Sequence, residues 1–397
     1  MRILVVYPDP FDRASFERVP GHDFLFFEPA PSHWRPDPSF DPIDYLDRCL
    51  AFARRHDVDA VVSTHDLGDL IAAIVARELG LRGPSPESVF LCLHKYYGRR
   101  REAEPVRCIA VPLFEQPPRI DYPAYFKPPW LKLGLLAFKL ENDADLQRAL
   151  EIARREYPAW SRQYAPLFAR AVDAETYPLA AADVMLVEEF VEGPQVTVEG
   201  WVRGGSANIW AITDTNTYSG TRVIDNFSLP SRHDAETLEA MSRYAADAVA
   251  RLGFDNGFFN AELWKTADGL RLTEVNGRAA VCFTGLYHAA LGADIFTAIA
   301  DLACGNEPRE IPHGTGTVSG QFNVITFANG LAGELVDFEE ARRIPELAIY
   351  HDRNDLIRPA SEFGAVLGQI ELSGSSYEAI HQKAEEIRRR VAVPLRF

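Results

Sequence analysis

The first 93 residues alternate short apolar runs with amphipathic stretches. The apolar run Ile3–Tyr7 is typical of a strand buried on both faces, and two further runs, Phe24–Phe27 and Val58–Ser63, also predict strands. Two stretches carry apolar residues at helical spacing: Tyr45–Arg55, and Leu70–Leu79 with Gly80 at its end. Strands that alternate with helices predict a parallel, doubly wound sheet, so we expect an N-terminal α/β domain over residues 1–93.

The pattern changes after this domain. Prolines between residues 105 and 129 favour strands and turns over long helices. Two later pairs of apolar runs predict hairpins, the first of Val184–Val191 with Gln195–Val202, the second of Phe258–Trp264 with Leu270–Val275. A helix between them is predicted to begin after Asp234 and to end at Gly253.

A third region begins near residue 313. Strand-like segments at Gly316–Phe327 and Ala365–Leu372, followed by a helical pattern over Tyr377–Val391, predict a small, separate C-terminal α+β domain over residues 313–397. The expected organisation is therefore α/β and α+β, with a central domain over residues 94–312 whose first part, about 100–190, forms a smaller subdomain.

The second hairpin carries two glutamates whose placement depends on register. Alternation predicts that Asn260, Glu262 and Trp264 share a face, and that Leu272, Glu274 and Asn276 share a face of the returning strand. A three-residue loop at 267–269 would place the two glutamates opposite each other, whereas a two-residue turn would put them on opposite faces.

Opposed carboxylates repel each other unless a cation lies between them. Two glutamates and an asparagine oxygen are ligands suited to Mg²⁺. The hairpin therefore predicts a metal site of Glu262, Glu274 and Asn276. A solvated polar edge with two ordinary surface glutamates is the alternative.

Other polar residues suit a nucleotide. Lys95, and Lys127 at the end of a predicted strand, are candidates for neutralising phosphate, although a surface position is the usual one for lysine. The apolar run that breaks into a polar turn at Leu186–Gln195 could pair with an adenine edge, or could form an exposed hairpin with a charged tip. Arg222 and His288 are further candidates for contact with substrate, with a structural role as the alternative.

The amino-acid composition limits the kinds of molecule that we expect the protein to bind. The chain has 41 lysines and arginines against 57 aspartates and glutamates, a formal charge of −16, which argues against nucleic acid. An acidic protein that binds ATP needs local lysines and divalent metal to hold it. The five scattered cysteines are expected to be reduced, and we see neither a signal peptide nor a membrane span, so we expect a cytoplasmic protein.

Taken in order, four segments resemble the ATP-grasp superfamily: His94-Lys95-Tyr96, Tyr125-Phe126-Lys127-Pro128, Val187–Gly193, and Glu262 with Leu272–Arg278. The resemblance spans residues 1 to about 312. The closing Glu-Val-Asn-Gly-Arg is its most specific part. With the added C-terminal domain, the chain is similar to L-amino-acid ligases that make dipeptides.

This resemblance implies an ATP-grasp fold and a role for each matching residue. Lys95 and Lys127 would contact ATP phosphates, and Arg278 would face the reacting centre. The remaining implied contacts are to adenine, from Glu188, Glu189 and Val191; to ribose, from Gln195 or Glu199; and to two Mg²⁺ or Mn²⁺ ions, from Glu262, Glu274 and Asn276. A homodimer is also implied.

The implied activity is that of an ATP-dependent carboxylate–amine ligase. A carboxylate would be phosphorylated to an acyl phosphate, an amine would attack it, and both substrates would be small molecules, expected to be amino acids. Residues 128–139 are the expected closing loop, although they are bulkier than the glycine-rich loop usual in the family. The alternatives are an ATP-grasp enzyme with a hydroxyl, thiol or carboxyphosphate partner, and a catalytically silent nucleotide-binding module.

Overall fold

A small parallel sheet begins the chain. The computed structural model describes residues 1–28, 36–132, 134–219, 221–359 and 364–392. The first sheet lies within residues 1–62 and has the strand order β2-β1-β3. Its strands are β1 (Arg2–Val6), β2 (Asp23–Phe27) and β3 (Ala60–Val62).

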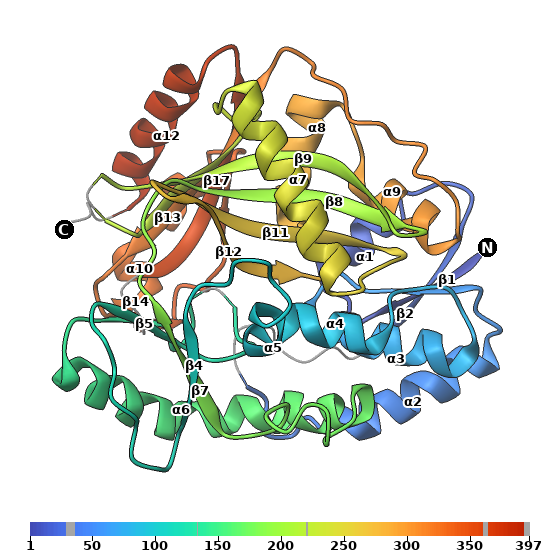
Figure 1. Cartoon of the computed structure of the whole chain (residues 1–397). Helices are drawn as coiled ribbons and strands as arrows, with labels where there is room; N and C mark the ends of the chain where they lie inside the picture. The colour runs from blue at the N-terminus through green and yellow to red at the C-terminus, as the bar shows by residue number, and fades with distance from the viewer. Residues whose placement is uncertain (29–35, 133, 220, 360–363, 393–397) are drawn as a thin grey trace.

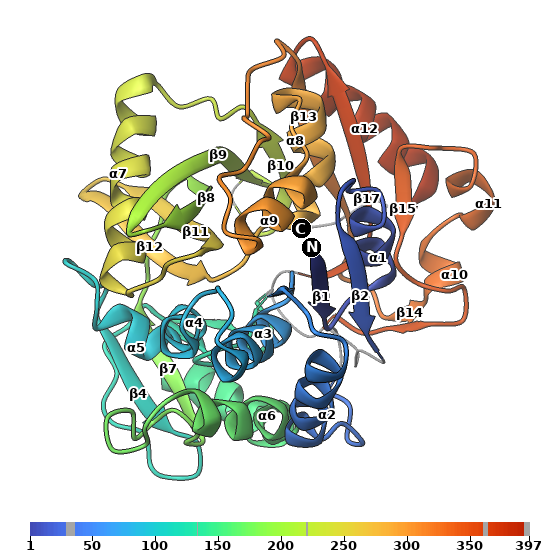
Figure 2. The same ribbon diagram turned by 90° about the vertical axis from the view of Figure 1, so that its right-hand side faces the viewer.

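Helices cover both faces of this sheet, because successive side chains of a strand point to opposite faces. Leu4 and Val6 pack with α2 (Pro42–Arg55) and α3 (Asp66–Leu79). Ile3 and Val5 pack with α1 (Pro10–Phe16) and α9 (Ile295–Ala303). The predicted doubly wound arrangement is therefore confirmed. Helices α4 (Pro86–Leu93) and α5 (Lys95–Arg99) lead from it into the next sheet (Figure 2).

The second sheet is antiparallel, with the order β4-β7-β5-β6. Its strands are β4 (Cys108–Pro112), β5 (Ala124–Lys127), β6 (Phe138–Leu140) and β7 (Val184–Glu189). The long helix α6 (Asp143–Ala171) packs against it and lies beside α2 at the lower edge of the molecule (Figure 1). This helix contains Pro158 and Pro166 and was not predicted.

The large central sheet is also antiparallel, with the order β12-β11-β8-β9-β10-β13-β17-β15. Its first part comprises β8 (Gln195–Arg203), β9 (Ser206–Thr217), β10 (Ile224–Leu229), β11 (Gly257–Thr266) and β12 (Gly269–Asn276). The predicted helix is present as α7 (Ala235–Arg251), capped by Asp234. After β12 come the 3-10 turn η1 (Val281–Phe283) and α8 (Thr284–Leu291).

One predicted hairpin is wrong. Strand β7 pairs with β4 and β5, whereas β8 pairs with β9 and β11, so the two strands belong to different sheets. Because both edges of each strand are occupied, neither has an edge left for the other. Residues 190–194 instead connect the two sheets.

The C-terminal strands extend the central sheet. They are β13 (Val318–Thr326), β15 (Leu347–Ile349) and β17 (Ala365–Gly374). A separate small sheet joins β14 (Gly330–Leu331) to β16 (Leu356–Ile357), and α10 (Ala332–Leu335), α11 (Phe338–Ala341) and α12 (Tyr377–Val391) complete this part. It has its own apolar core, but it shares its main sheet with the region before it. The terminal helix has the predicted bounds.

Two findings concern covalent and membrane features of the described residues. The five cysteines are all free. No single helix there is long and apolar enough to cross a membrane, and the segments Val281–Leu291 and Ile295–Ala303 reach that composition only together, across a bend of 114°.

Candidate active site

The two glutamates of the β11–β12 hairpin lie opposite each other. Thr266 pairs with Gly269, so the turn between the strands has only two residues. A β-bulge at Thr273 then shifts the register by one residue, and this shift pairs Glu262 with Glu274. The predicted opposition of the glutamates is confirmed, but the three-residue loop from which it was inferred is wrong.

The bulge has a second consequence. Leu272 pairs with Leu263 and is buried in the core, so its predicted place on the face of Glu274 is wrong. Arg99 of α5 holds the bulge in place, since its guanidinium donates to the carbonyl oxygens of Leu272 and Thr273, both at 2.6 Å. The side chain of Arg99 therefore fixes the register of the paired glutamates.

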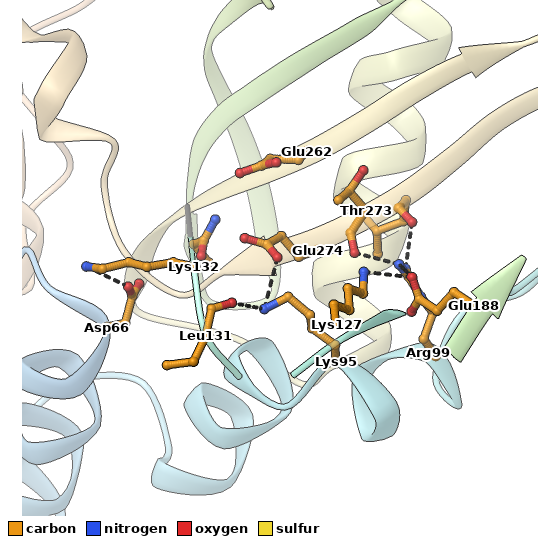
Figure 3. Close-up of polar contacts among 12 residues, drawn as sticks. Asp66, Lys95, Arg99, Lys127, Leu131, Lys132, Glu188, Glu262, Thr273 and Glu274 are labelled. Carbon is orange, nitrogen blue, oxygen red and sulfur yellow. Dashed lines mark hydrogen bonds and ion pairs between the residues drawn. The ribbon is translucent and has the colours of Figure 1, made fainter. Parts of the chain in front are cut away.

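The paired glutamates carry more negative charge than their surroundings offset. Lys95 Nζ lies 3.0 Å from Glu274 Oε2 and 2.7 Å from the carbonyl oxygen of Leu131 (Figure 3). Gln195 donates a hydrogen bond of 3.0 Å to Glu262. Burial, and next the charge of Glu274, raises the pKa of Glu262 to about 8. A divalent cation fits this donor set, because one ammonium cannot balance two buried carboxylates.

Asn276, the third predicted ligand, is held by a chain of hydrogen bonds. Its amide nitrogen donates to Asn260 Oδ1 at 3.2 Å, which leaves its own carbonyl oxygen available to a ligand. Asn260 in turn donates to Glu199 at 3.0 Å, and Thr213 donates to the same carboxylate at 3.1 Å. Glu199 is buried in this chain, and burial raises its pKa to about 8.

A second charged cluster lies next to the first and is balanced. Lys127 Nζ is 2.6 Å from Glu188 Oε2, and Arg99 Nε is 2.8 Å from Glu188 Oε1 (Figure 3). Arg99 also pairs with Glu102 at 2.7 Å. Although burial alone would raise the pKa of Glu188, Arg99 and Lys127 lower it to about 2. The structure thus brings Lys127 and Glu188 together as an ion pair inside the protein.

Arg278 forms an ion pair with Asp66, at the first residue of α3. Lys132 Nζ lies 3.0 Å from the other oxygen of Asp66. Burial alone would raise the pKa of Asp66, but the charges of Arg278 and Lys132 hold it below its usual range. Two cations thus converge on one carboxylate.

The connection between the sheets carries the residues predicted to hold adenine and ribose. Glu189 is partly exposed and pairs with Arg107 at 3.0 Å. The carbonyl oxygen of Val191 accepts a hydrogen bond of 3.2 Å from Arg222. That guanidinium also lies over three aromatic rings, with its carbon 4.4 Å from the ring centre of Phe190 and 5.0–5.2 Å from those of Trp264 and Tyr125.

The predicted closing loop is anchored. Trp130 stacks on Tyr164 of α6 at 4.6 Å, and both Trp130 and Leu131 are buried. Leu133, in the same loop, lies outside the described residues. The backbone nitrogen of Lys95 donates to the carbonyl oxygen of Pro129 at 2.7 Å. The described residues at the start of this loop therefore form a wall beside the paired glutamates.

The sequence profile of the ATP-grasp domain matches residues 120–285, which include Lys127, Glu188, Glu262, Glu274 and Asn276. Residues 120–285 are therefore similar to an ATP-grasp domain.

Solved ATP-grasp structures share the fold. An L-amino acid ligase from Bacillus licheniformis superposes with a TM-score of 0.75 over 100% of this chain and 99% of its own, at 17% identity. A carboxyaminoimidazole ribonucleotide synthase from Aspergillus clavatus, complexed with ATP, gives a TM-score of 0.68 over 98% of both chains, at 14% identity. The predicted ATP-grasp fold is therefore confirmed.

A curated relative is similar in sequence. Carnosine synthase 1 from Mus musculus is 25% identical over 66% of this chain and 33% of its own length. The chain thus spans about a third of the length of this relative.

The sequence analysis missed three charged residues of the site: Asp66, Arg99 and Lys132. Arg99 follows Lys95 by four residues, a helical spacing that could have identified it. Asp66 comes three residues after the predicted strand that ends at Ser63, near the sheet edge where ligands of α/β proteins bind. Lys132 lies in a loop, and no pattern there indicates where its side chain points.

Proposed function

We propose that this protein is an ATP-dependent carboxylate–amine ligase that joins amino acids through an amide or peptide bond and releases ADP and phosphate. The observation that carries the proposal is the pairing of Glu262 with Glu274 on a buried hairpin face, with Lys95 as their cation. A silent nucleotide-binding module would have no need of two opposed carboxylates, since their repulsion destabilises the hairpin. Such a pair is better explained as a ligand set for Mg²⁺.

The positions of Lys95 and Lys127 support their proposed role in ATP binding. Lys95 and Lys127 are each oriented by a carboxylate within 3.0 Å, so their ammonium groups are preorganised for phosphate oxygens. Glu262, Glu274 and Asn276 would hold two Mg²⁺ or Mn²⁺ ions, which, when bound, offset charge on the phosphoryl group being transferred. Residues 189–191, at the connection between the sheets, would pair with adenine.

The reaction has two steps. A substrate carboxylate oxygen attacks the γ-phosphorus of ATP, the bond to the β-phosphate oxygen breaks, and an acyl phosphate and ADP form. The amine then attacks the acyl carbon and forms a tetrahedral oxyanion. The oxyanion collapses, the bond to phosphate breaks, and the nitrogen loses a proton to give the amide. Arg278 would stabilise the oxyanion. The buried wall of Trp130 and Leu131 would limit hydrolysis of the acyl phosphate by excluding water.

Two comparisons support amino acids as substrates. One relative is named a carnosine synthase and one similar structure is named an L-amino acid ligase. Another similar structure is a carboxyaminoimidazole ribonucleotide synthase, so the fold also occurs with a different chemistry. The sequence similarity to carnosine synthase 1 favours the amino-acid ligase.

The test measures ADP release by the purified protein with Mg-ATP and pooled amino acids. Pairs of amino acids are then scanned by mass spectrometry for a product equal to their sum less one water. We expect ADP, phosphate and the condensed product in equal amounts. Release of ADP only with bicarbonate, or only with hydroxyl or thiol acceptors, would replace this proposal by another ATP-grasp chemistry.

A further inference from the structure

Three aromatic rings surround one guanidinium group beside the connection between the two antiparallel sheets. The rings belong to Tyr125 of β5, Phe190 of the connection and Trp264 of β11, and together they form what we call the aromatic box. The guanidinium belongs to Arg222, and its carbon lies 4.4 Å from the nearest ring centre, that of Phe190. All four side chains are only half-buried, so a ligand can reach the box from solvent.

The aromatic box lies where the nucleotide is proposed to bind. Trp264 pairs with Gln195, the predicted ribose contact, and comes two residues after the predicted metal ligand Glu262 on the same strand. Tyr125 pairs with Glu188 on the other sheet. Nucleobases stack on aromatic side chains, so three rings at this position suit the adenine of ATP.

Arg222 already makes the contacts that adenine would need. Its Nη2 atom donates a hydrogen bond of 3.2 Å to the carbonyl oxygen of Val191, one of the residues proposed to pair with adenine. Its guanidinium also lies against the three rings. A guanidinium and an adenine are both flat groups that stack on aromatic rings and carry N–H donors, so they compete for the same place.

The position of Arg222 is not fully satisfied. Its Nη1 atom is inaccessible to solvent and has no hydrogen-bond partner among the described residues, and such a buried donor costs free energy. The backbone around it is held separately: the nitrogen of Tyr218 donates to the carbonyl oxygen of Val223 at 2.9 Å, and the nitrogen of Val223 donates to Thr221 Oγ1 at 3.1 Å. The side chain of Arg222 can therefore leave by rotation about its own bonds.

We propose that Arg222 occupies the place of adenine in the nucleotide-free protein and is displaced when ATP binds. The adenine then stacks in the aromatic box, its amino group donates to the carbonyl oxygen of Val191, and the guanidinium turns to solvent. Arg222 thus lowers the affinity for ATP, because its contacts must break before adenine can form its own. This inference rests on the proposed function and concerns the nucleotide of that same site.

The experiment measures the binding of Mg-ADP to the purified protein by calorimetry. Arg222→Ala removes the competing group, so it should tighten binding about 5- to 50-fold, the range expected when one hydrogen bond and one cation–π contact no longer compete. Arg222→Met keeps much of the apolar packing but loses the charge and the N–H donors. It should also tighten binding, and it tests the inference if the alanine variant does not fold.

Arg353→Ala is the matched control. Arg353 also lies over an aromatic ring, with its carbon 5.3 Å from the ring centre of Phe338, and it pairs with Glu339 at the surface of the C-terminal region. This variant should leave the affinity for Mg-ADP unchanged. Circular dichroism checks that each variant is folded.

The outcomes separate this inference from the proposed function. Weaker or unchanged binding of Mg-ADP in the folded Arg222 variants overturns the inference, and so does a lack of binding in wild type and variants alike. If binding tightens but no pair of substrates gives ADP, Arg222 holds the place of adenine and the proposed ligase function is wrong. If substrates are condensed but binding does not tighten, only the inference fails.

Discussion

Two charged clusters lie side by side at the β11–β12 hairpin, and they differ in how their charge is balanced. The balanced cluster of Arg99, Lys127, Glu102 and Glu188 has two positive and two negative groups. Among the described residues, the acidic pair, Glu262 and Glu274, makes one direct ion pair, between Glu274 and Lys95.

Burial raises the carboxylate pKa in both clusters, but the neighbouring charges act in opposite directions. In the balanced cluster the cations lower the pKa of Glu188 to about 2 against the effect of burial, whereas in the acidic pair burial and Glu274 raise the pKa of Glu262 to about 8. The charges of the balanced cluster are offset by protein groups alone, so this cluster serves to position residues. The acidic pair lacks an equal positive charge, as expected of a site that receives a cation.

The largest expected effect is on the balanced cluster. Arg99→Ala should lower the free energy of unfolding by about 3–5 kcal/mol, because it leaves buried carboxylates uncompensated and frees the carbonyl oxygens of the bulge. Urea denaturation measures this loss. Arg48→Ala, which removes a half-exposed ion pair with Asp44, is the control and should change stability by less than about 1 kcal/mol. Equal losses in both variants would contradict the role assigned to Arg99.

The acidic pair should respond in the opposite way. Glu274→Gln should lower turnover at least about 100-fold, because it removes a metal ligand. Above about pH 8, where both carboxylates are charged, it should also raise the stability of the metal-free protein, since the repulsion between the carboxylates disappears. Thermal unfolding with and without Mg²⁺ tests both expectations: Mg²⁺ should stabilise the wild type and have little effect on the variant. Normal turnover in Glu274→Gln would rule out the proposed metal site.

Glu199 gives a prediction for pH. Its pKa is about 8 in the folded protein against a reference value of 4.5, so the folded state binds its proton more tightly. Its contribution to stability is therefore fully present below pH 4.5 and is lost as the pH rises through about 8, by up to about 1.4 kcal/mol per pH unit. Glu199→Gln should flatten this dependence in denaturation measured from pH 5 to pH 9. An unchanged slope would contradict the assignment.

The smallest effect is expected at the surface. Glu189→Gln breaks a partly exposed ion pair with Arg107 and should change the free energy of unfolding by less than about 1 kcal/mol. If Glu189 contacts adenine as proposed, KM for ATP should rise while stability stays the same. Denaturation and ADP-release assays on one preparation make this comparison, and a large loss of stability would show that Glu189 has a structural role.

Local patterns predicted the elements of this protein better than their pairing. The strands of the N-terminal sheet, the helix after Asp234 and the terminal helix follow from apolar periodicity and end signals. The hairpin expected around Gly193 is absent because both strands pair with distant segments, and such pairing has no local signal. Helix α6 was not predicted, and it contains Pro158 and Pro166, residues that disfavour a helix interior.

The site was predictable where a motif specified it. The pairing of Glu262 with Glu274 was expected, although the bulge at Thr273 that produces it was not. Lys132 reaches Asp66 through packing between segments far apart in the sequence, so its position required the structure.

The bulge at Thr273 also determines which deletion the hairpin can tolerate without losing the pairing of the glutamates. The turn lacks one residue relative to the loop that would align the glutamates directly, and the bulge supplies that residue farther along the strand. Deleting Thr273 should therefore remove the bulge and still keep the carboxylates aligned across the same two-residue turn, because Glu274 would then directly follow Leu272, the partner of Leu263.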